Sequence, residues 1–192
     1  MTKVFISGSI KIKSIDENIM NRLDKLVESD FSILIGDANG VDTSIQHYFK
    51  DHHSKQVTVY CTGDNPRNNL NHWPIKIIRT KAAVGTRAFF TAKDIAMADD
   101  CDYGFMIWDC QSAGTLNNVL ELIKRGKISL VYLNKNKTYR KVMSVNDVNE
   151  LIQCMSKVAL DKADQKLKIL ETLEILKSNK PQTIKFEQIS LF

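Results

Sequence analysis

The stretch Tyr103-Gly104-Phe105-Met106-Ile107-Trp108-Asp109-Cys110-Gln111-Ser112-Ala113-Gly114-Thr115 joins an apolar run to a helical pattern through small and hydroxyl residues. The run over 103–108 is continuous and apolar, which is typical of a strand buried on both faces of a parallel sheet. Beyond Gly114, apolar residues recur at helical spacing. The loop is therefore predicted to join the carboxyl end of a strand to the start of a helix, where free N–H groups and the helix dipole favour an anion.

The same order of strand and helix repeats along the chain. Apolar runs predict strands at 3–8, 31–35, 56–61, 103–108 and 128–133, with a possible short strand at 75–78. Helical patterns begin near Asp16, Asp42, Arg87 and Ala113, and one continues through most of 144–179. This alternation predicts an α/β fold, a three-layer Rossmann-like parallel sheet with a C-terminal helical extension. The expected units are a nucleotide-binding domain over 1–134, the extension over 144–179 and a terminal tail over 180–192.

Length and composition exclude several classes of protein. A chain of 192 residues with 43% hydrophobic content can form one domain with an appendage. No apolar run approaches the roughly 18 residues that span a bilayer, and the start lacks the layout of a signal peptide, so we expect a cytoplasmic protein without membrane contact. The four cysteines form no CxxC pair and the histidines have no partner at ligand spacing. We therefore expect no disulfide, no metal and no cofactor.

The positive charge is concentrated near the end of the chain. Residues 1–133 hold 16 basic and 15 acidic side chains, whereas residues 134–192 hold 11 basic and 7 acidic ones, and the net charge is +5. A mildly basic helical segment is compatible with a solvated surface or with contacts to nucleic acid. Direct binding of nucleic acid therefore stays open at this stage.

Three turns with glycine follow three of the predicted strands. If the strands at 3–8, 31–35 and 103–108 are neighbours, these turns converge on one crevice, where open α/β sheets bind ligands. Glycine lets the backbone approach a ligand, and hydroxyl and carboxylate groups supply hydrogen bonds to phosphate or ribose. Each turn has an equally good structural explanation, because tight turns need glycine for positive φ. The candidate ligand-binding residues in them are Gly8, Ser9, Gly36, Asp37, Gly40, Asp42, Ser112, Gly114 and Thr115.

Two further side chains are candidates for chemistry. Arg87 begins a helix after Gly85 and Thr86. Its guanidinium can bind a phosphate through two hydrogen bonds there, or it can simply lie at the surface. Asp109 follows directly after the buried run, and its carboxylate can bind ribose hydroxyls or stabilise positive charge on a sugar carbon. Its neighbour Trp108 fits a core position better than a platform for base stacking.

The ordered set of motifs resembles the SLOG superfamily of Rossmann-like domains, which includes the DprA proteins of DNA processing and the LOG phosphoribohydrolases. The resemblance covers about residues 3 to 133. The matching residues are Gly36-x-x-x-Gly40-x-Asp42, Lys81-Ala82-Ala83-x-Gly85-x-Arg87, Met97, Asp102 and Ser112-x-Gly114-Thr115. The nucleoside deoxyribosyltransferases, with a strand-end Asp followed by Ser-x-Gly-Thr, are the nearest rival match.

The resemblance implies a nucleotide or nucleotide-derived ligand, with phosphate at Gly114, Thr115 and Arg87. Separately, we expect a homo-oligomer that associates through the C-terminal helices. In the LOG enzymes a glutamate supports loss of the base, and its position here is Asn118. An amide cannot accept a proton or balance an oxocarbenium-like charge. We therefore place ligand binding first and hydrolysis of an N-glycosidic bond, with Asp109 or Glu121 as the working carboxylate, as the alternative.

The end of the chain carries an independent signal. Gln188-Ile189-Ser190-Leu191-Phe192 resembles the peptide by which many bacterial proteins dock on the replication sliding clamp. In such a peptide Leu191 and Phe192 would fill an apolar pocket and Gln188 would bond at its edge. The alternative is that this segment packs on the domain. A third hypothesis for function is therefore an accessory protein of DNA metabolism that is recruited to the clamp.

Overall fold

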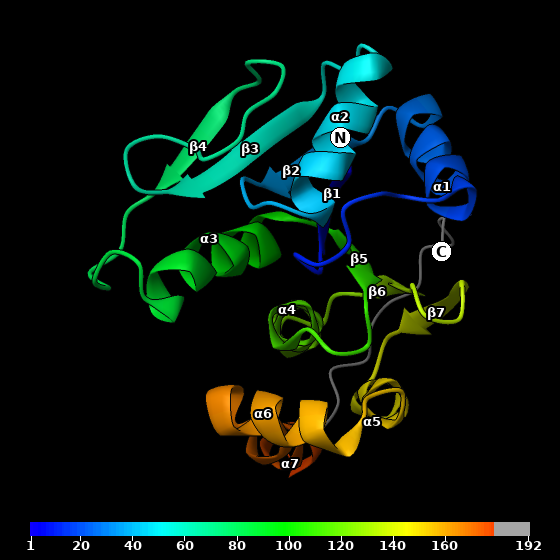
Figure 1. The fold of residues 1–192 in the computed structure, drawn as a ribbon, viewed down its shortest axis with the longest axis vertical. Helices are drawn as coiled ribbons and strands as arrows, with labels where there is room; N and C mark the ends of the chain where they lie inside the picture. Colours follow the sequence, from blue (N-terminus) through cyan, green and yellow to red (C-terminus); the bar gives the residue numbers. More distant parts are fainter. Residues whose placement is uncertain (179–192) are drawn as a thin grey trace.

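The computed structural model describes residues 1–178 of the chain (Figure 1). Strands and helices alternate through most of it, as the apolar pattern predicts. The strands are β1 (Lys3–Gly8), β2 (Ser32–Gly36), β3 (Val57–Thr62), β4 (Ile75–Ile78), β5 (Tyr103–Trp108), β6 (Ser129–Leu133) and β7 (Thr138–Val142). The helices are α1 (Glu17–Glu28), α2 (Val41–Asp51), α3 (Arg87–Asp100), α4 (Ala113–Lys124), α5 (Val145–Gln153), α6 (Lys157–Leu167) and α7 (Ile169–Ser178).

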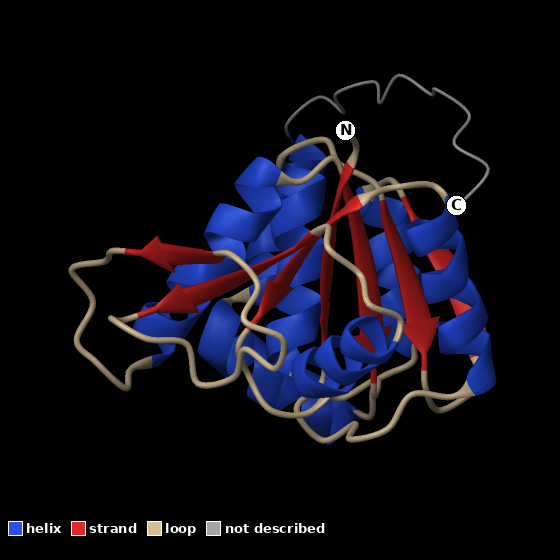
Figure 2. Cartoon of the chain, turned by 90° about the horizontal axis from the view of Figure 1, so that it is seen from above, coloured by secondary structure: helices blue, strands red, loops and turns tan. Residues whose placement is uncertain are grey.

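The seven strands form one sheet in the order β4-β3-β2-β1-β5-β6-β7. The first six are parallel to their neighbours, and β7 runs antiparallel to β6. Figure 2 shows the twist of the sheet from one edge to the other. The α/β Rossmann-like fold is confirmed, and so is the adjacency on which the site hypothesis depends, because β1 lies between β2 and β5.

Side chains of the central strands alternate between two apolar cores, since successive residues of a strand point to opposite faces. Val4 and Ile6 of β1 join the core beneath α1 and α2, whereas Phe5 joins the core beneath α3 and α4. Figure 1 shows these two helix layers on either side of the sheet. The side chain of Trp108 is 1% exposed and belongs to the second core, which confirms its structural role.

The C-terminal helices form a further layer outside α4. Ala163 of α6 and Ile169 and Leu173 of α7 are buried in the same core as α4. The expected extension is helical, but it is divided into three helices. α5 ends before Cys154, and α6 ends before Lys168, which adopts a left-handed conformation and separates α6 from α7. Leu170 and Ile175 of α7 remain exposed, and self-association through these helices stays a prediction.

Strand β7 was not predicted. It occupies Thr138–Val142, between the two expected units, and pairs with β6 through a tight hairpin in which Lys137 has φ 55°. Its residues are mostly polar and partly exposed because it lies at the edge of the sheet, so the apolar pattern is weak there. Within the described residues, no helix is both long and apolar enough to cross a membrane.

Candidate functional site

The sheet order brings the three glycine turns to one edge. The turns after β2, β1 and β5 follow strands that are hydrogen-bonded neighbours and point the same way. Their side chains nevertheless divide into two groups with different surroundings. One group lies between β1 and β5, and the other lies between β2 and α3.

In the first group, the Asp109 carboxylate organises the turn after β5. Its Oδ1 accepts hydrogen bonds from Ser9 Oγ at 3.0 Å, Gln111 N at 2.9 Å and Ser112 N at 2.7 Å. Ser9 Oγ also accepts from Asp109 N at 3.1 Å and lies 3.4 Å from Thr115 Oγ1. These bonds join the end of β1 to the start of α4 and hold the turn in one conformation.

The first turn of α4 has no side-chain cap. Ser112 is the cap residue, yet its side chain makes no capping hydrogen bond to the first-turn amides. A Cβ added to Gly114 would have Ser112 Oγ as its nearest neighbour, at 4.0 Å. Packing thus gives no reason for glycine at this position, whereas a ligand held close to the backbone would.

A cavity of about 370 Å³ lies directly over this turn. Its floor comes from Asp109, Gln111, Ser112 and Ala113, and one wall comes from the turn after β1. The other lining residues belong to α6 and its N-cap residue Ser156. The residues that line it are Ile10, Lys11, Asp109, Gln111, Ser112, Ala113, Ser156, Val158, Ala159, Lys162, Ala163 and Lys166.

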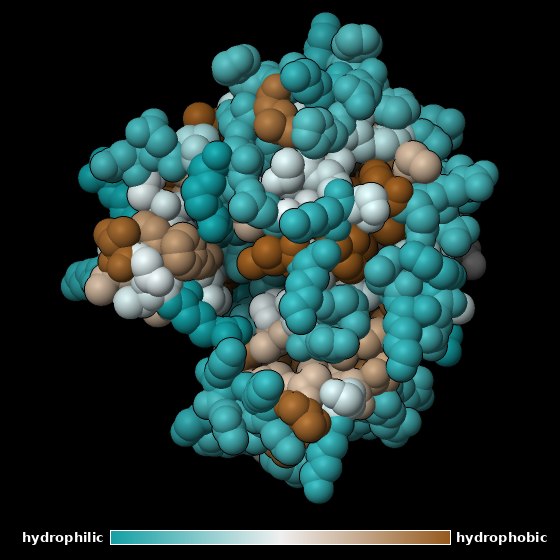
Figure 3. Space-filling model, viewed as in Figure 1, coloured by the Kyte–Doolittle hydropathy of each residue, from teal (hydrophilic) through white to brown (hydrophobic). Residues whose placement is uncertain are grey.

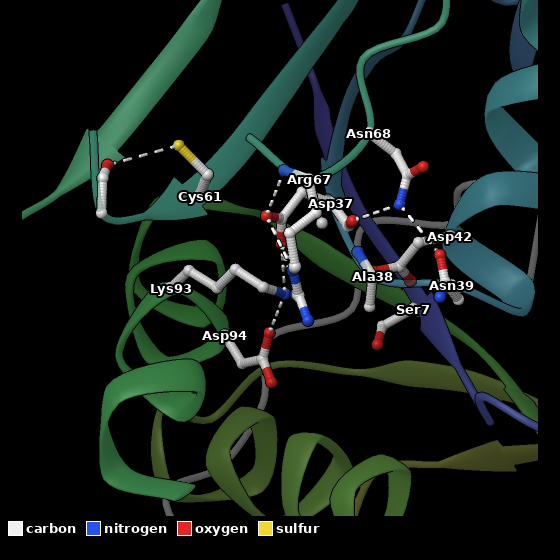
Figure 4. Close-up of polar contacts among 12 residues, drawn as sticks. Ser7, Asp37, Ala38, Asn39, Asp42, Cys61, Arg67, Asn68, Lys93 and Asp94 are labelled. Atoms are coloured by element: carbon white, nitrogen blue, oxygen red, sulfur yellow. Dashed lines mark hydrogen bonds and ion pairs between the residues drawn. The ribbon is translucent and has the colours of Figure 1, made fainter. Parts of the chain in front are cut away.

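In the second group, the turn after β2 is closed by the protein's own charges (Figure 4). Asp37 is 2% exposed, and the Arg67 side chain binds it through two bonds, Nη2 to Oδ1 at 2.7 Å and Nε to Oδ2 at 3.1 Å. The backbone N–H of Arg67 donates to Asp37 Oδ2 at 3.0 Å. Arg67 belongs to the long connection between β3 and β4. A bidentate ion pair therefore attaches this connection to the turn after β2.

Lys93 of α3 completes this ion cluster, which we define as Asp37, Asp42, Arg67, Lys93 and Asp94. The Lys93 Nζ atom lies 2.8 Å from Asp94 Oδ1 and 3.9 Å from Asp37 Oδ1, and the residue is only 4% exposed. Asp42 Oδ2 accepts from Ala38 N at 3.2 Å. A Cβ on Gly36 would lie 2.4 Å from Asp42 Oδ2 and 2.5 Å from Lys93 Nζ, so glycine here makes room for the cluster.

Burial and charge shift the pKa values within the cluster in opposite directions. Burial raises the pKa of Asp42 to about 6, and Lys93 only partly opposes this effect. For Asp37, burial acts in the same sense, but the hydrogen bonds from Arg67 outweigh it and lower the pKa. As the pH falls, the Asp42 carboxyl group therefore gains its proton at a higher pH than an ordinary aspartate does.

Most of the predicted site residues are packed inside the protein. Ser9 and Thr115 are buried in the first turn, and Asp37 and Asp42 are buried in the ion cluster. A Cβ on Gly8 would lie 2.4 Å from Ile107 O, and one on Gly40 would lie 2.3 Å from Ile10 O. Of the predicted residues, Asp109 and Ser112 line the cavity, and Gly114 is exposed beside them.

Arg87 and Glu121 lie away from the cavity lining. Arg87 is exposed at the start of α3, which packs mainly on β3, and the surface over this end of α3 is partly apolar in Figure 3. Glu121 binds Lys124 and Arg125 on the surface of α4, and although burial opposes the effect, these hydrogen bonds lower its pKa. The tail residues Gln188, Leu191 and Phe192 lie outside the described residues.

The sequence reasoning missed the cations of both groups. Lys162 and Lys166 belong to α6, and Lys11 follows β1 without any motif around it. The basic excess of the last third of the chain was the available signal, but it named no residue. Arg67 and Lys93 were missed because their partners are distant in the sequence.

Comparison with known proteins supports the fold alone. No family model matches the chain, and no curated protein matches it either. Among solved structures, DNA processing protein A from Helicobacter pylori, described for its single-stranded DNA binding mode, is similar with a TM-score of 0.56. The identity is 17%, over 87% of this chain and 80% of that one. The chain therefore has a DprA-like fold.

Proposed function

We propose that this protein binds a nucleotide-type ligand in the cavity between the turn after β1, the start of α4 and α6, with a phosphate against the first turn of α4. The observation that carries the proposal is the combination of an uncapped helix start with a lysine-bearing cavity above it. Backbone N–H groups at a helix start and the helix dipole favour an anion. The volume of about 370 Å³ lies within the range of small-ligand sites.

Isothermal titration calorimetry with a panel of nucleotides tests the proposal, with Gln111→Glu as the deciding variant. Gln111 is exposed and lines the cavity, so the variant adds one negative charge there without altering the shape of the side chain. We expect about a tenfold loss of affinity, since about 1.4 kcal/mol of repulsion is reasonable for charges a few ångströms apart near a surface. Gln165→Glu, an exposed residue of α6 outside the cavity lining, is the matched control.

Two outcomes would contradict the proposal. One is the absence of binding by every nucleotide tested. The other is an equal loss of affinity in Gln111→Glu and Gln165→Glu, because the effect would then reflect net charge and not this cavity.

Hydrolysis of an N-glycosidic bond is a second candidate, favoured by the position of Asp109. Its carboxylate lines the cavity, and the hydrogen bonds that it accepts are on Oδ1. A negative charge beside a bound sugar stabilises an oxocarbenium-like transition state. Chromatographic detection of free base released from nucleoside monophosphates tests this activity, and Asp109→Asn should abolish it. Turnover that persists in Asp109→Asn would exclude this residue from the reaction.

Binding of single-stranded nucleic acid is the third candidate, and it follows from the likeness in fold to a protein studied for single-stranded DNA binding. The lysines of the cavity suit a phosphodiester backbone as well as a free nucleotide. Fluorescence anisotropy with a labelled oligonucleotide tests it. Affinity that falls steeply with salt and in Gln111→Glu would support the candidate, and no binding at low salt would remove it. Docking on the sliding clamp remains a separate hypothesis for the tail.

A further inference from the structure

Helix α6 and its N-cap residue Ser156 together supply half of the residues that line the cavity. The helix is held in place by Ala163, which is buried against the core shared with α4. Lys162 and Lys166 line the cavity four residues apart, so they lie on the same side of the helix and about 6 Å apart along its axis. The wall therefore carries a row of two positive charges.

The charge of the cavity exceeds what one phosphate group needs. Lys11, Lys162 and Lys166 line it together with a single carboxylate, Asp109, which leaves a formal charge of +2. Among the described residues, none of these lysines forms an ion pair with a carboxylate. The first turns of α4 and α6 both line the cavity, and each helix start contributes roughly half a positive charge. The total is about +3, whereas one phosphate monoester carries about −1.5 to −2 at neutral pH.

The lysines come from two separate segments that line the cavity. Lys11 follows β1, Lys162 and Lys166 belong to α6, and the start of α4 lines the same cavity. A phosphate at the floor leaves the row on α6 for a second anionic group of the same ligand. The volume of the cavity favours a single nucleotide over a longer strand.

We propose that the ligand of this cavity carries two or more phosphate groups, as a nucleoside diphosphate or triphosphate does, and that Lys162 and Lys166 of α6 set this preference. The inference rests on the proposed nucleotide-binding function. It gives the C-terminal extension a role in specificity, in addition to its packing on α4.

The test is calorimetric titration of the full chain with adenosine and guanosine mono-, di- and triphosphates at constant ionic strength. Wild type should bind the diphosphate of the preferred base at least about tenfold more tightly than its monophosphate. In Lys162→Gln/Lys166→Gln this preference should disappear, because affinity for the diphosphate falls at least about tenfold more than affinity for the monophosphate. The double variant Lys25→Gln/Lys50→Gln removes the same charge from exposed sites of α1 and α2 outside the cavity and should keep the preference.

Each contrary result has a distinct meaning. Equal affinity of wild type for mono- and diphosphates overturns this inference while nucleotide binding stands. Loss of the preference in the control variant overturns the role of α6. Absence of binding by every nucleotide overturns the proposed function itself. A single-stranded oligonucleotide that binds more tightly than any free nucleotide, and that loses affinity in Lys162→Gln/Lys166→Gln, overturns the class of ligand. Thermal unfolding of both variants checks that they fold, which is expected because all four lysines are exposed.

Discussion

The turns after β2 and after β5 have similar sequences and opposite surroundings. Both follow a buried parallel strand, and both combine glycine with an aspartate. After β2, Arg67 and Lys93 occupy the space above the aspartates and seal it. After β5, Asp109 is satisfied within its own turn and a lysine-bearing cavity remains above it.

This difference shows that a glycine turn at the carboxyl ends of parallel strands indicates a site for charged groups. It does not indicate whether those groups belong to the protein or to a ligand. In the ion cluster the protein supplies its own counter-charges, because side chains of α3 and of the connection after β3 neutralise the carboxylates of the turn after β2. At the cavity, by contrast, Lys11, Lys162 and Lys166 form no ion pair among the residues that the structure describes, so their charge is available to a ligand. Substitutions in the two regions should therefore affect different properties.

The largest effect is expected from Lys93→Met. The variant keeps the volume of the side chain but leaves the carboxylates of Asp37, Asp42 and Asp94 without their buried cation. Removing one partner of a buried ion pair typically costs about 3–5 kcal/mol of unfolding free energy. Urea denaturation at pH 7 measures this loss, and the loss should shrink toward pH 4 because Asp42, whose pKa is raised by burial to about 6, gains a proton in this range.

Lys50→Met, at an exposed site of α2, is the control and should change stability by less than about 0.5 kcal/mol. A small effect of Lys93→Met at pH 7 would mean that the cluster is not sealed, and the contrast between the two turns would fail.

Asp42→Asn should change how stability depends on pH. The pKa of Asp42 is about 6 in the folded protein against 3.8 for an ordinary aspartate, so the folded state binds more protons between these values. Wild type should therefore lose up to about 3 kcal/mol as pH rises from about 4 to about 7, at about 1.36 kcal/mol for each unit of pKa. The asparagine variant lacks this loss.

The measurement is urea unfolding of both proteins from pH 4 to pH 7, with the exposed Asp51→Asn as a control. The variant should gain stability relative to wild type as the pH rises. A difference between the two that is constant over this range would show that Asp42 is charged throughout, contrary to the raised pKa.

The smallest effects on stability are expected from paired glycine substitutions. Gly36→Ala places a methyl group against Asp42 and Lys93 and should cost about 1–3 kcal/mol. Gly114→Ala meets open space at the start of α4 and should be neutral or stabilising by up to about 1 kcal/mol, since alanine favours helix.

Ligand affinity should show the reverse order. Gly114→Ala should weaken nucleotide binding because its methyl group covers the backbone that a phosphate would approach, and Gly36→Ala should leave affinity unchanged in folded protein. Chemical denaturation and calorimetry on the same two variants measure both properties. Equal behaviour of the two glycines in either assay would remove the distinction between the closed and the open turn.

The fold was largely predictable because it depends on local patterns. The buried runs of β1, β2, β3 and β5 are short and apolar, and helical spacing follows β1, β2 and β5 directly, so a parallel sheet is the arrangement that buries both faces. The cap at Asp16 was also visible, and its side chain does accept from Ile19 N. Strand β7 was missed because an edge strand buries little and carries few apolar residues.

The sequence by itself determined the alternation of strands and helices, the polar turns at one edge and the basic character of the last third of the chain. Only the tertiary structure decided which turn is open. Arg67 and Lys93 reach Asp37 from segments about 30 and 56 residues away, and packing of Ala163 against the core brings Lys162 and Lys166 to the same cavity as Lys11. The physical reason is that a carboxylate's partner is set by distance in space, whereas a sequence motif records only distance along the chain.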